Sequence, residues 1–293
     1  MDKIYIIIPF FDGWPQLKTC LDALRASHYG NREVIVVNHG TEDEARELLR
    51  DQYPEVLQIF ASPVLWWAGA TNVGIRTAMS RGAKKIMLLN HDCYFEPDTI
   101  QRIVAHAQKA GEAIIAPVPF DYITKRVLAV TARTCFLLGF PTLTLPGKTK
   151  FLGQPRLLPT KLILGGRGVL IPSSVFERLG LFDEVNLPSY YCDFDFFLRC
   201  RNRGIPLFIA ANARVYVDDT RTSLAEVEDM SFQRFLQTLI VPRSHRNIRD
   251  LTAIFKFHYP IKGLHHLGVA LNLGRYCTLY AWKRLKRTLR KFL

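Results

Sequence analysis

Short apolar runs alternate with amphipathic segments along the first two thirds of the chain. Five of these runs predict strands, and the run at 86–89, which leaves no room for a polar face, predicts a buried one. The five runs cover residues 3–9, 32–38, 56–60, 86–89 and 113–118. Between the runs, apolar residues recur at the three- and four-residue spacing of helices, as over residues 17–24 and 97–110. Strands that alternate with helices in this order predict an α/β fold whose mostly parallel sheet is flanked by helices.

The pattern changes after residue 130. Prolines and glycines interrupt residues 131–160, which predicts a long loop region with at most short strands. A glycine cluster follows within residues 162–171, and the next segments predict a helix from Pro172 and another over residues 190–203. Two further strands are predicted, over residues 206–210 and 213–217.

The stretch from residue 84 to residue 98 places polar side chains directly after a buried strand. The apolar run at 86–89 ends in Asn90-His91-Asp92. Open α/β sheets bind ligands at the carboxyl ends of their strands. Asp92 is therefore a candidate for binding a metal or a metal-bound phosphate. The competing interpretation is that Asn90 and Asp92 only form a turn.

Composition limits the class of protein. The chain has 293 residues, of which 48% are hydrophobic, so it is long enough for one large α/β domain with an appendage. No uncharged apolar stretch is long enough to span a membrane, and the N-terminal run is better interpreted as a first strand than as a signal peptide. The six cysteines form no C-x-x-C, which indicates reduced thiols in the cytoplasm rather than a zinc site or disulfides.

Positive charge is concentrated at the C-terminus. The net charge is +13, and residues 231–293 hold 13 lysines and arginines against one acid, Asp250. We therefore expect a catalytic domain over residues 1–225 and a basic, mostly helical extension over residues 226–293. No glycine-rich phosphate loop follows Pro9, which disfavours a dinucleotide-dependent oxidoreductase.

Six motifs occur in a fixed order along the chain. They are IIIPFFD at 6–12, VVNHGTED at 36–43, WAGATNVG at 67–74, LLNHDCYF at 88–95, GGRGVLIPSSVFERLGLFDE at 165–184 and YCDFDFFLRCRNRG at 191–204. Together they resemble the inverting family 2 glycosyltransferases, which have the GT-A fold, and in particular the rhamnosyltransferase-like members of bacterial surface-polysaccharide assembly. The resemblance spans roughly residues 3–223.

The resemblance implies a site for a nucleotide-diphosphate sugar. The positions that match the donor-binding motifs are Pro9, Phe11, Asn38, Asn72, Asn90, Asp92, Gly165 and Gly166. Asn38 stands where the family usually has an Asp that contacts the base, so base recognition is altered in detail. The glycine pair would let the backbone approach the donor sugar, although a strand bulge is the alternative.

The same resemblance implies the metal site and the base. Asp92 matches the metal-binding Asp, with Mg²⁺ or Mn²⁺ as the cofactor, and Asp193 matches the general base. The alternative for Asp193 is a helix N-cap. The family's acid before the base is Cys192 here, and the metal-binding His after the last strand is missing, with Asp218 as a possible replacement. These departures keep a second hypothesis open: a catalytically degenerate relative that only binds sugar nucleotides or glycans.

The resemblance suggests a glycan or a polyprenyl-lipid-linked sugar as the acceptor. Trp282, Leu285, Leu289 and Phe292 recur on one helical face, while basic residues fall mostly off it. This pattern is typical of a helix in an anionic membrane interface rather than of nucleic-acid binding. We therefore expect a cytoplasmic enzyme on the inner face of the plasma membrane. The alternative is a helix whose apolar face packs on the catalytic domain.

Overall fold

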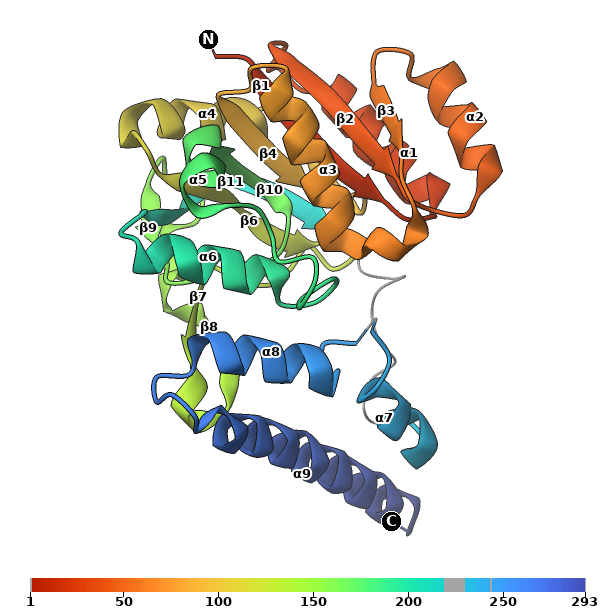
Figure 1. Ribbon diagram of the computed structural model, residues 1–293, viewed down its shortest axis with the longest axis vertical. Coiled ribbons are helices and arrows are strands. Elements are labelled where there is room, and N and C mark those ends of the chain that lie inside the picture. The colour runs from red at the N-terminus through yellow and green to blue at the C-terminus, as the bar shows by residue number, and fades with distance from the viewer. Residues whose placement is uncertain (1, 219–229, 243, 293) are drawn as a thin grey trace.

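The computed structural model describes residues 2–218, 230–242 and 244–292, without the side chains of residues 145–148 and 288–292. Figure 1 shows a twisted sheet with helices on both faces, above a separate helical layer. The sheet runs in the order β3 (Leu57–Phe60), β2 (Arg32–Asn38), β1 (Ile4–Phe10), β4 (Lys85–Leu89), β10 (Arg167–Pro172), β6 (Ile114–Asp121), β11 (Leu207–Val217) and β5 (Cys93–Phe95), with β9 (Leu157–Pro159) beside β11. β10, β9 and β5 run antiparallel to the other strands, so the predicted mostly parallel sheet is confirmed.

Alternation along the strands builds two apolar layers, because successive side chains point to opposite faces. In β1, Ile4, Ile6 and Ile8 belong to one buried cluster and Tyr5 and Ile7 to the other. The first layer is covered by α1 (Trp14–Arg25), α2 (Asp43–Gln52) and α4 (Thr99–Ala110). The second is covered by α3 (Trp66–Ser80), α5 (Ser173–Leu179) and α6 (Cys192–Asn202).

Two segments differ from the sequence prediction. Much of the expected loop at 131–160 is a hairpin of β7 (Thr131–Cys135) and β8 (Phe140–Leu145), with short 3₁₀ turns at Phe136–Leu138 and Pro146–Phe151. The two strands expected at 206–210 and 213–217 are one strand, β11. Its register against β6 shifts between Ala210 and Arg214, so a bulge interrupts the local pattern while the strand continues.

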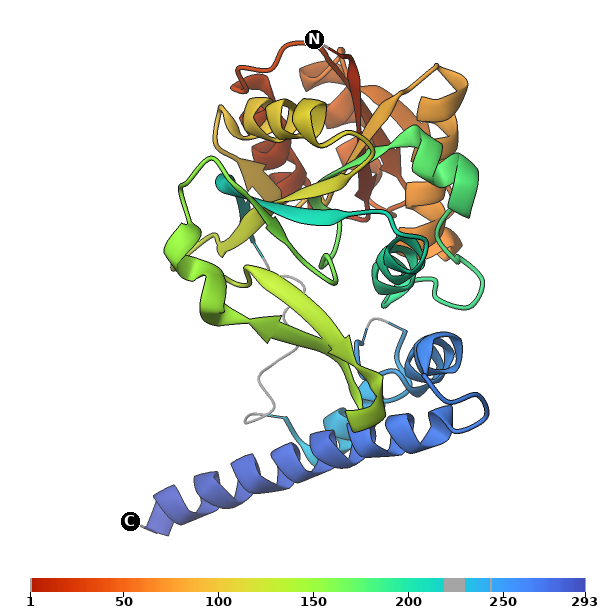
Figure 2. The same cartoon turned by 90° about the vertical axis from the view of Figure 1, so that its left-hand side faces the viewer.

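The C-terminal extension consists of α7 (Phe232–Thr238), α8 (Ile248–His258) and α9 (His265–Phe292), as the predicted helical character required. Figure 1 shows α8 beneath α6 and α9 beneath α8, and Figure 2 shows the β7–β8 hairpin reaching from the sheet to α9. Buried α8 residues, among them Leu251, Ile254 and Phe255, belong to the same apolar cluster as α3 and α6. The extension is therefore packed against the catalytic part. The predicted boundary at residue 225 lies outside the described residues and stays a prediction.

Polar contacts also join the extension to the rest of the chain. Nε2 of His258 in α8 lies 2.8 Å from Oδ1 of Asp195 in α6. The Asn272 side chain in α9 donates a 2.7 Å hydrogen bond to the carbonyl of Gly139, at the turn of the hairpin. Gly139 has φ of +72°, and a Cβ at this position would lie 2.7 Å from the backbone nitrogen of Asn272. Glycine therefore permits the close approach of α9 to the hairpin. None of the described helices combines the length and apolar character that a membrane span needs.

Candidate active site

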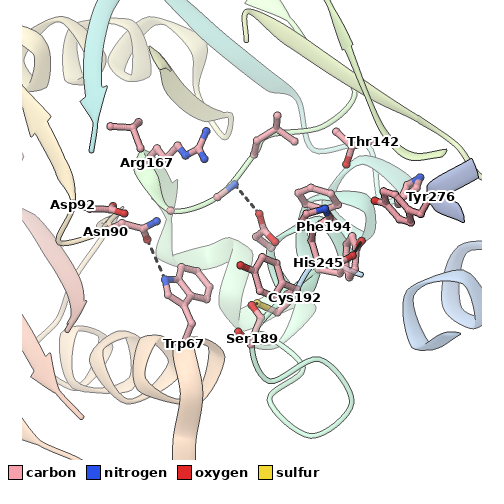
Figure 3. A pocket seen from close by; sticks show the side chains of 18 of the residues that line it. Trp67, Asn90, Asp92, Thr142, Arg167, Ser189, Cys192, Phe194, His245 and Tyr276 are labelled. Atoms are coloured by element: carbon pink, nitrogen blue, oxygen red, sulfur yellow. Dashed lines mark hydrogen bonds between the residues drawn. The ribbon is translucent and has the colours of Figure 1, made fainter. Parts of the chain in front are cut away.

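A cavity of about 600 Å³ lies where the sheet, α6 and the extension meet. Figure 3 shows Asn90 and Asp92 on one side of it and Thr142, His245 and Tyr276 on the opposite side. The lining residues that the sequence had singled out are Asn90, Asp92, Gly165, Gly166, Cys192 and Asp193. Segments that are far apart in sequence thus meet around one space.

Asn90 is fixed by hydrogen bonds at the end of β4. Its backbone N–H donates to the carbonyl of Gly166 at 2.6 Å, and its Oδ1 accepts from the indole N–H of Trp67 at 3.0 Å. Cys93 N–H donates to the Asn90 carbonyl at 3.1 Å, which closes a turn. The turn therefore forms, and Asp92 also lines the cavity. The binding of a metal or a metal-bound phosphate by Asp92 stays a prediction.

The glycine pair lies against the side chains of this wall. Gly165 has φ of +74°, a conformation that disfavours other residues. A Cβ on Gly166 would lie 2.8 Å from the Trp67 ring and 2.9 Å from Oδ1 of Asn90. A strand bulge is present, but it lies after the pair, between Arg167 and Val169, where β10 shifts register against β4. The bulge is thus an additional feature and does not account for the pair.

Asp193 is the second residue of α6 and faces the cavity. Its Oδ2 accepts a 2.6 Å hydrogen bond from the backbone N–H of Gly165. Burial raises the pKa of its carboxyl group to about 6, partly opposed by that hydrogen bond. The N-cap position of α6 is Tyr191, so the alternative assignment of Asp193 as the cap is wrong.

Asp218 lies next to Asp92 because β5 and β11 pair, with Val217 opposite Cys93. The backbone N–H of Asp218 donates to the Asp92 carbonyl at 2.8 Å. Among the described residues, no three His, Cys, Asp or Glu side chains form a metal-binding group. One or two carboxylates are nevertheless the usual protein share of a Mg²⁺ site that is completed by substrate phosphates. The residues present therefore fit a divalent metal that arrives with a diphosphate.

Four predicted donor-binding residues do not line this cavity: Pro9, Phe11, Asn38 and Asn72. The buried Asn38 side chain accepts a hydrogen bond from Gly40 N–H at 3.1 Å. Both ends of the Asn72 amide are engaged with the backbone of Phe182, at 3.0 and 3.1 Å. In this structure Asn72 joins α3 to the segment before α6, and the predicted nucleotide contacts of all four residues stay predictions.

Several cavity residues had not been selected from the sequence. Arg167 directly follows the glycine pair, and this position in the motif is the signal from which it could have been selected. Thr142 comes from the hairpin, and His245, Arg275 and Tyr276 come from the extension. No local pattern marks these four, because only the packing of the hairpin and the extension brings them to the cavity.

Comparisons with known proteins identify the family. Residues 5–180 match the model of Glycosyl transferase family 2. An uncharacterized glycosyltransferase of Rickettsia typhi is 25% identical over 99% of this chain and 92% of its own length. The dTDP-rhamnosyl transferase RfbF of Shigella flexneri is 24% identical over 73% of this chain and 68% of its own length.

Solved structures show the same fold. The crystal structure of S. aureus TarS 1-349 in complex with UDP-GlcNAc has a TM-score of 0.60 at 13% identity, over 97% of this chain and 92% of that TarS chain. The structure of GalNAc-T7 with UDP, GalNAc and Mn²⁺ has a TM-score of 0.63 at 12% identity, over 95% of this chain and 55% of the other. The predicted GT-A fold is therefore confirmed.

Proposed function

This chain belongs to glycosyl transferase family 2, and from that premise we propose that it is an inverting glycosyltransferase. It transfers a hexosyl or deoxyhexosyl group from a nucleotide-diphosphate sugar to an acceptor hydroxyl. The observation that carries the proposal is that Asp92 and Asp193, the two acids lining the cavity, approach it from different elements. This arrangement favours catalysis over a degenerate relative, because both family acids are retained and share one space.

Inversion requires a single displacement at the anomeric carbon, with a base to take the proton from the attacking hydroxyl. Asp193 is suited to this role. A pKa of about 6 leaves the carboxylate ionised at neutral pH while making it a stronger base than an ordinary aspartate. The hydrogen bond from Gly165 N–H fixes the carboxylate at the mouth of α6.

A nucleoside diphosphate leaves in this reaction and develops negative charge. Asp92, with Asp218 beside it, would hold Mg²⁺ or Mn²⁺. When bound, such an ion neutralises charge on the diphosphate. Arg167 lines the same side of the cavity and adds a fixed positive charge there. The glycine pair leaves backbone, and no side chain, beside the donor sugar.

The acceptor that we propose is a glycan or a polyprenyl-lipid-linked sugar, at the inner face of the plasma membrane. Exposed apolar side chains on α9 support a membrane contact: Leu267, Leu271, Leu279, Trp282 and Leu285. Basic residues alternate with them towards the C-terminus. The alternative was a helix whose apolar face packs on the catalytic domain. Trp282 and Leu285 are not packed in this way, since their side chains are 55% and 52% exposed. The side chains of Leu289 and Phe292 lie outside the described residues.

A donor screen tests the function. The full chain is incubated with UDP-, GDP- and dTDP-sugars and Mg²⁺ or Mn²⁺, and release of the nucleoside diphosphate is measured. We expect one nucleotide sugar to be hydrolysed slowly without acceptor, and this hydrolysis to fall strongly in Asp92→Ala. Absence of both binding and hydrolysis across the panel would contradict the proposal.

A further inference from the structure

The cavity wall contributed by the extension carries positive charge that no carboxylate of the described residues balances. Arg275 in α9 lines the cavity, and its guanidinium carbon lies 4.1 Å from the centre of the Phe140 ring. It forms no ion pair with any acid in the described part of the chain. The acids that line the cavity, Asp92 and Asp193, come from other elements. This wall is therefore suited to an anion.

A second arginine of the extension lies beside this wall: it follows His245 in sequence and contacts Tyr276. Arg246 is only 6% exposed, and its guanidinium carbon lies 5.4 Å from the centre of the Tyr276 ring. Its Nε and Nη1 atoms are buried and have no hydrogen-bond partner among the described residues. A buried charge without a partner is costly, and a nearby anion would lower that cost. The neighbouring His245 does not add charge, because burial lowers its pKa to about 4.

An apolar groove continues from this wall along α9. It lies between α7 and α9, encloses about 530 Å³ and is lined mainly by apolar side chains. The lining residues are Phe232, Phe235, Cys277, Tyr280, Ala281, Arg284 and Leu285. Tyr276 connects the two, since it lines the cavity and packs against the cluster of Phe235 and Tyr280, which line the groove. At 1.5 Å per residue, the part of α9 that lines the groove extends about 12 Å from Cys277 to Leu285.

We propose that the acceptor is a phosphate-bearing amphiphile and that the extension binds it in two places. Arg275, supported by Arg246, binds the phosphate or diphosphate, and the groove between α7 and α9 holds the first part of the hydrocarbon chain. The acceptor sugar then points from the phosphate towards Asp193. This inference rests on the proposed glycosyltransferase function and adds the residues that select the acceptor.

Binding of short, water-dispersible probes to the full chain tests the site. Farnesyl diphosphate, farnesol and inorganic pyrophosphate are titrated, and tryptophan fluorescence or calorimetry gives each Kd. We expect farnesyl diphosphate to bind more tightly than either other probe. Arg275→Gln should weaken it about tenfold or more, which is the scale of one charged hydrogen bond. Lys256→Gln, an exposed change of the same charge on α8, should leave the Kd unchanged.

A second variant separates the groove from the anion site. Ala281→Trp fills the groove on the exposed side of α9 and should weaken farnesyl diphosphate while sparing pyrophosphate. Equal affinity of wild type for pyrophosphate and farnesyl diphosphate would overturn the role of the groove. Circular dichroism of each variant checks that α9 is intact.

Competition distinguishes this proposal from the donor site. If nucleoside diphosphates displace farnesyl diphosphate, or if Asp92→Ala removes its binding and Arg275→Gln does not, the probe occupies the donor site and the inference is wrong. A wild-type chain that binds a nucleoside diphosphate but not farnesyl diphosphate would refute the acceptor site and leave the glycosyltransferase function standing. A chain that binds neither would refute both.

Discussion

The carboxylate of Asp193 lies 2.6 Å from the backbone nitrogen of Gly165. This hydrogen bond joins the start of α6 to the glycine pair before β10, two motifs that are 28 residues apart. Because the same glycine pair holds Asn90 through the Gly166 carbonyl, Asp193 and the wall with Asn90 and Asp92 share one backbone segment. Movement of that segment would change the position of Asp193 relative to this wall.

Asp193→Asn should remove the base and preserve the fold, since the amide keeps the size and one acceptor oxygen. We expect turnover to fall by about 10² or more, with little change in nucleoside-diphosphate affinity. Steady-state kinetics and equilibrium binding measure the two effects. Asp43→Asn, on the exposed start of α2, is the control and should retain full activity. Near wild-type turnover in Asp193→Asn would remove this residue as the base.

Activity should rise with pH through about 6. Burial raises the pKa of Asp193 to about 6, and only the ionised carboxylate can accept the proton. The rate should therefore be nearly constant above pH 7 and fall about tenfold for each unit below about pH 5. A profile of kcat/KM against pH measures this limb. A limb near pH 4, typical of an ordinary carboxyl group, would contradict the raised pKa.

Asp92→Ala should abolish metal dependence along with most of the activity. Asp92 is the acid of the 90–92 triplet, and the backbone of Asp218 hydrogen-bonds to its carbonyl. Titration of Mg²⁺ and Mn²⁺ into chelator-treated protein, with and without a nucleoside diphosphate, measures the dependence. Full activity of the wild type in excess chelator would show that basic residues such as Arg167 balance the diphosphate instead.

Asp195→Ala should destabilise the protein without acting on chemistry directly. The buried Asp195 carboxylate lies 2.8 Å from both Arg199 and His258, so its loss leaves two basic groups without their partner. We expect a loss of about 3 kcal/mol in the free energy of unfolding. Denaturant unfolding measures it. Asp51→Ala, in an exposed pair with Arg50, should change stability by less than about 0.5 kcal/mol.

The same contact predicts acid sensitivity. Burial opposes ionisation of Asp195, but the hydrogen bonds from His258 and Arg199 hold its pKa below the usual value. A carboxyl group with a lowered folded-state pKa stabilises the fold above its unfolded pKa and loses that contribution as the pH falls through the lowered one. Wild-type stability should therefore decrease in this acid range more steeply than that of Asp195→Ala.

Deletion of residues 279–293 should release the chain from anionic liposomes and spare donor hydrolysis. Trp282 and Leu285 are exposed, and each lysine or arginine near an anionic leaflet adds about 1 kcal/mol, or on the order of 5 kcal/mol for five. Liposome pelleting measures the release. High salt should also release the intact chain, since screening acts within a Debye length of about 8 Å at physiological ionic strength. A truncated chain that still pelleted, or that unfolded, would show a structural role for the tail.

The sequence by itself determined the local elements and the retained acids. The central β1 and β4 strands follow from runs of apolar residues, and α1 follows from Leu17, Cys20, Leu21 and Leu24 at helical spacing. These patterns are local, since side-chain period and burial are set by neighbours within a few residues. Asp92 and Asp193 could be identified from the sequence for a related reason, because each stands at a fixed place in a short motif.

The tertiary structure decided how distant segments share a cavity. Asn72 matched a donor-binding motif, but its amide is engaged with Phe182, 110 residues away. Arg275 carries no local signal and reaches the cavity only because α9 packs against α8 and the β7–β8 hairpin. Such contacts depend on the packing of whole elements, which the period of a single segment does not encode. The cavity wall with Asn90, Asp92 and the glycine pair was therefore predictable from sequence, whereas the opposite wall, with Thr142, His245 and Arg275, required the fold.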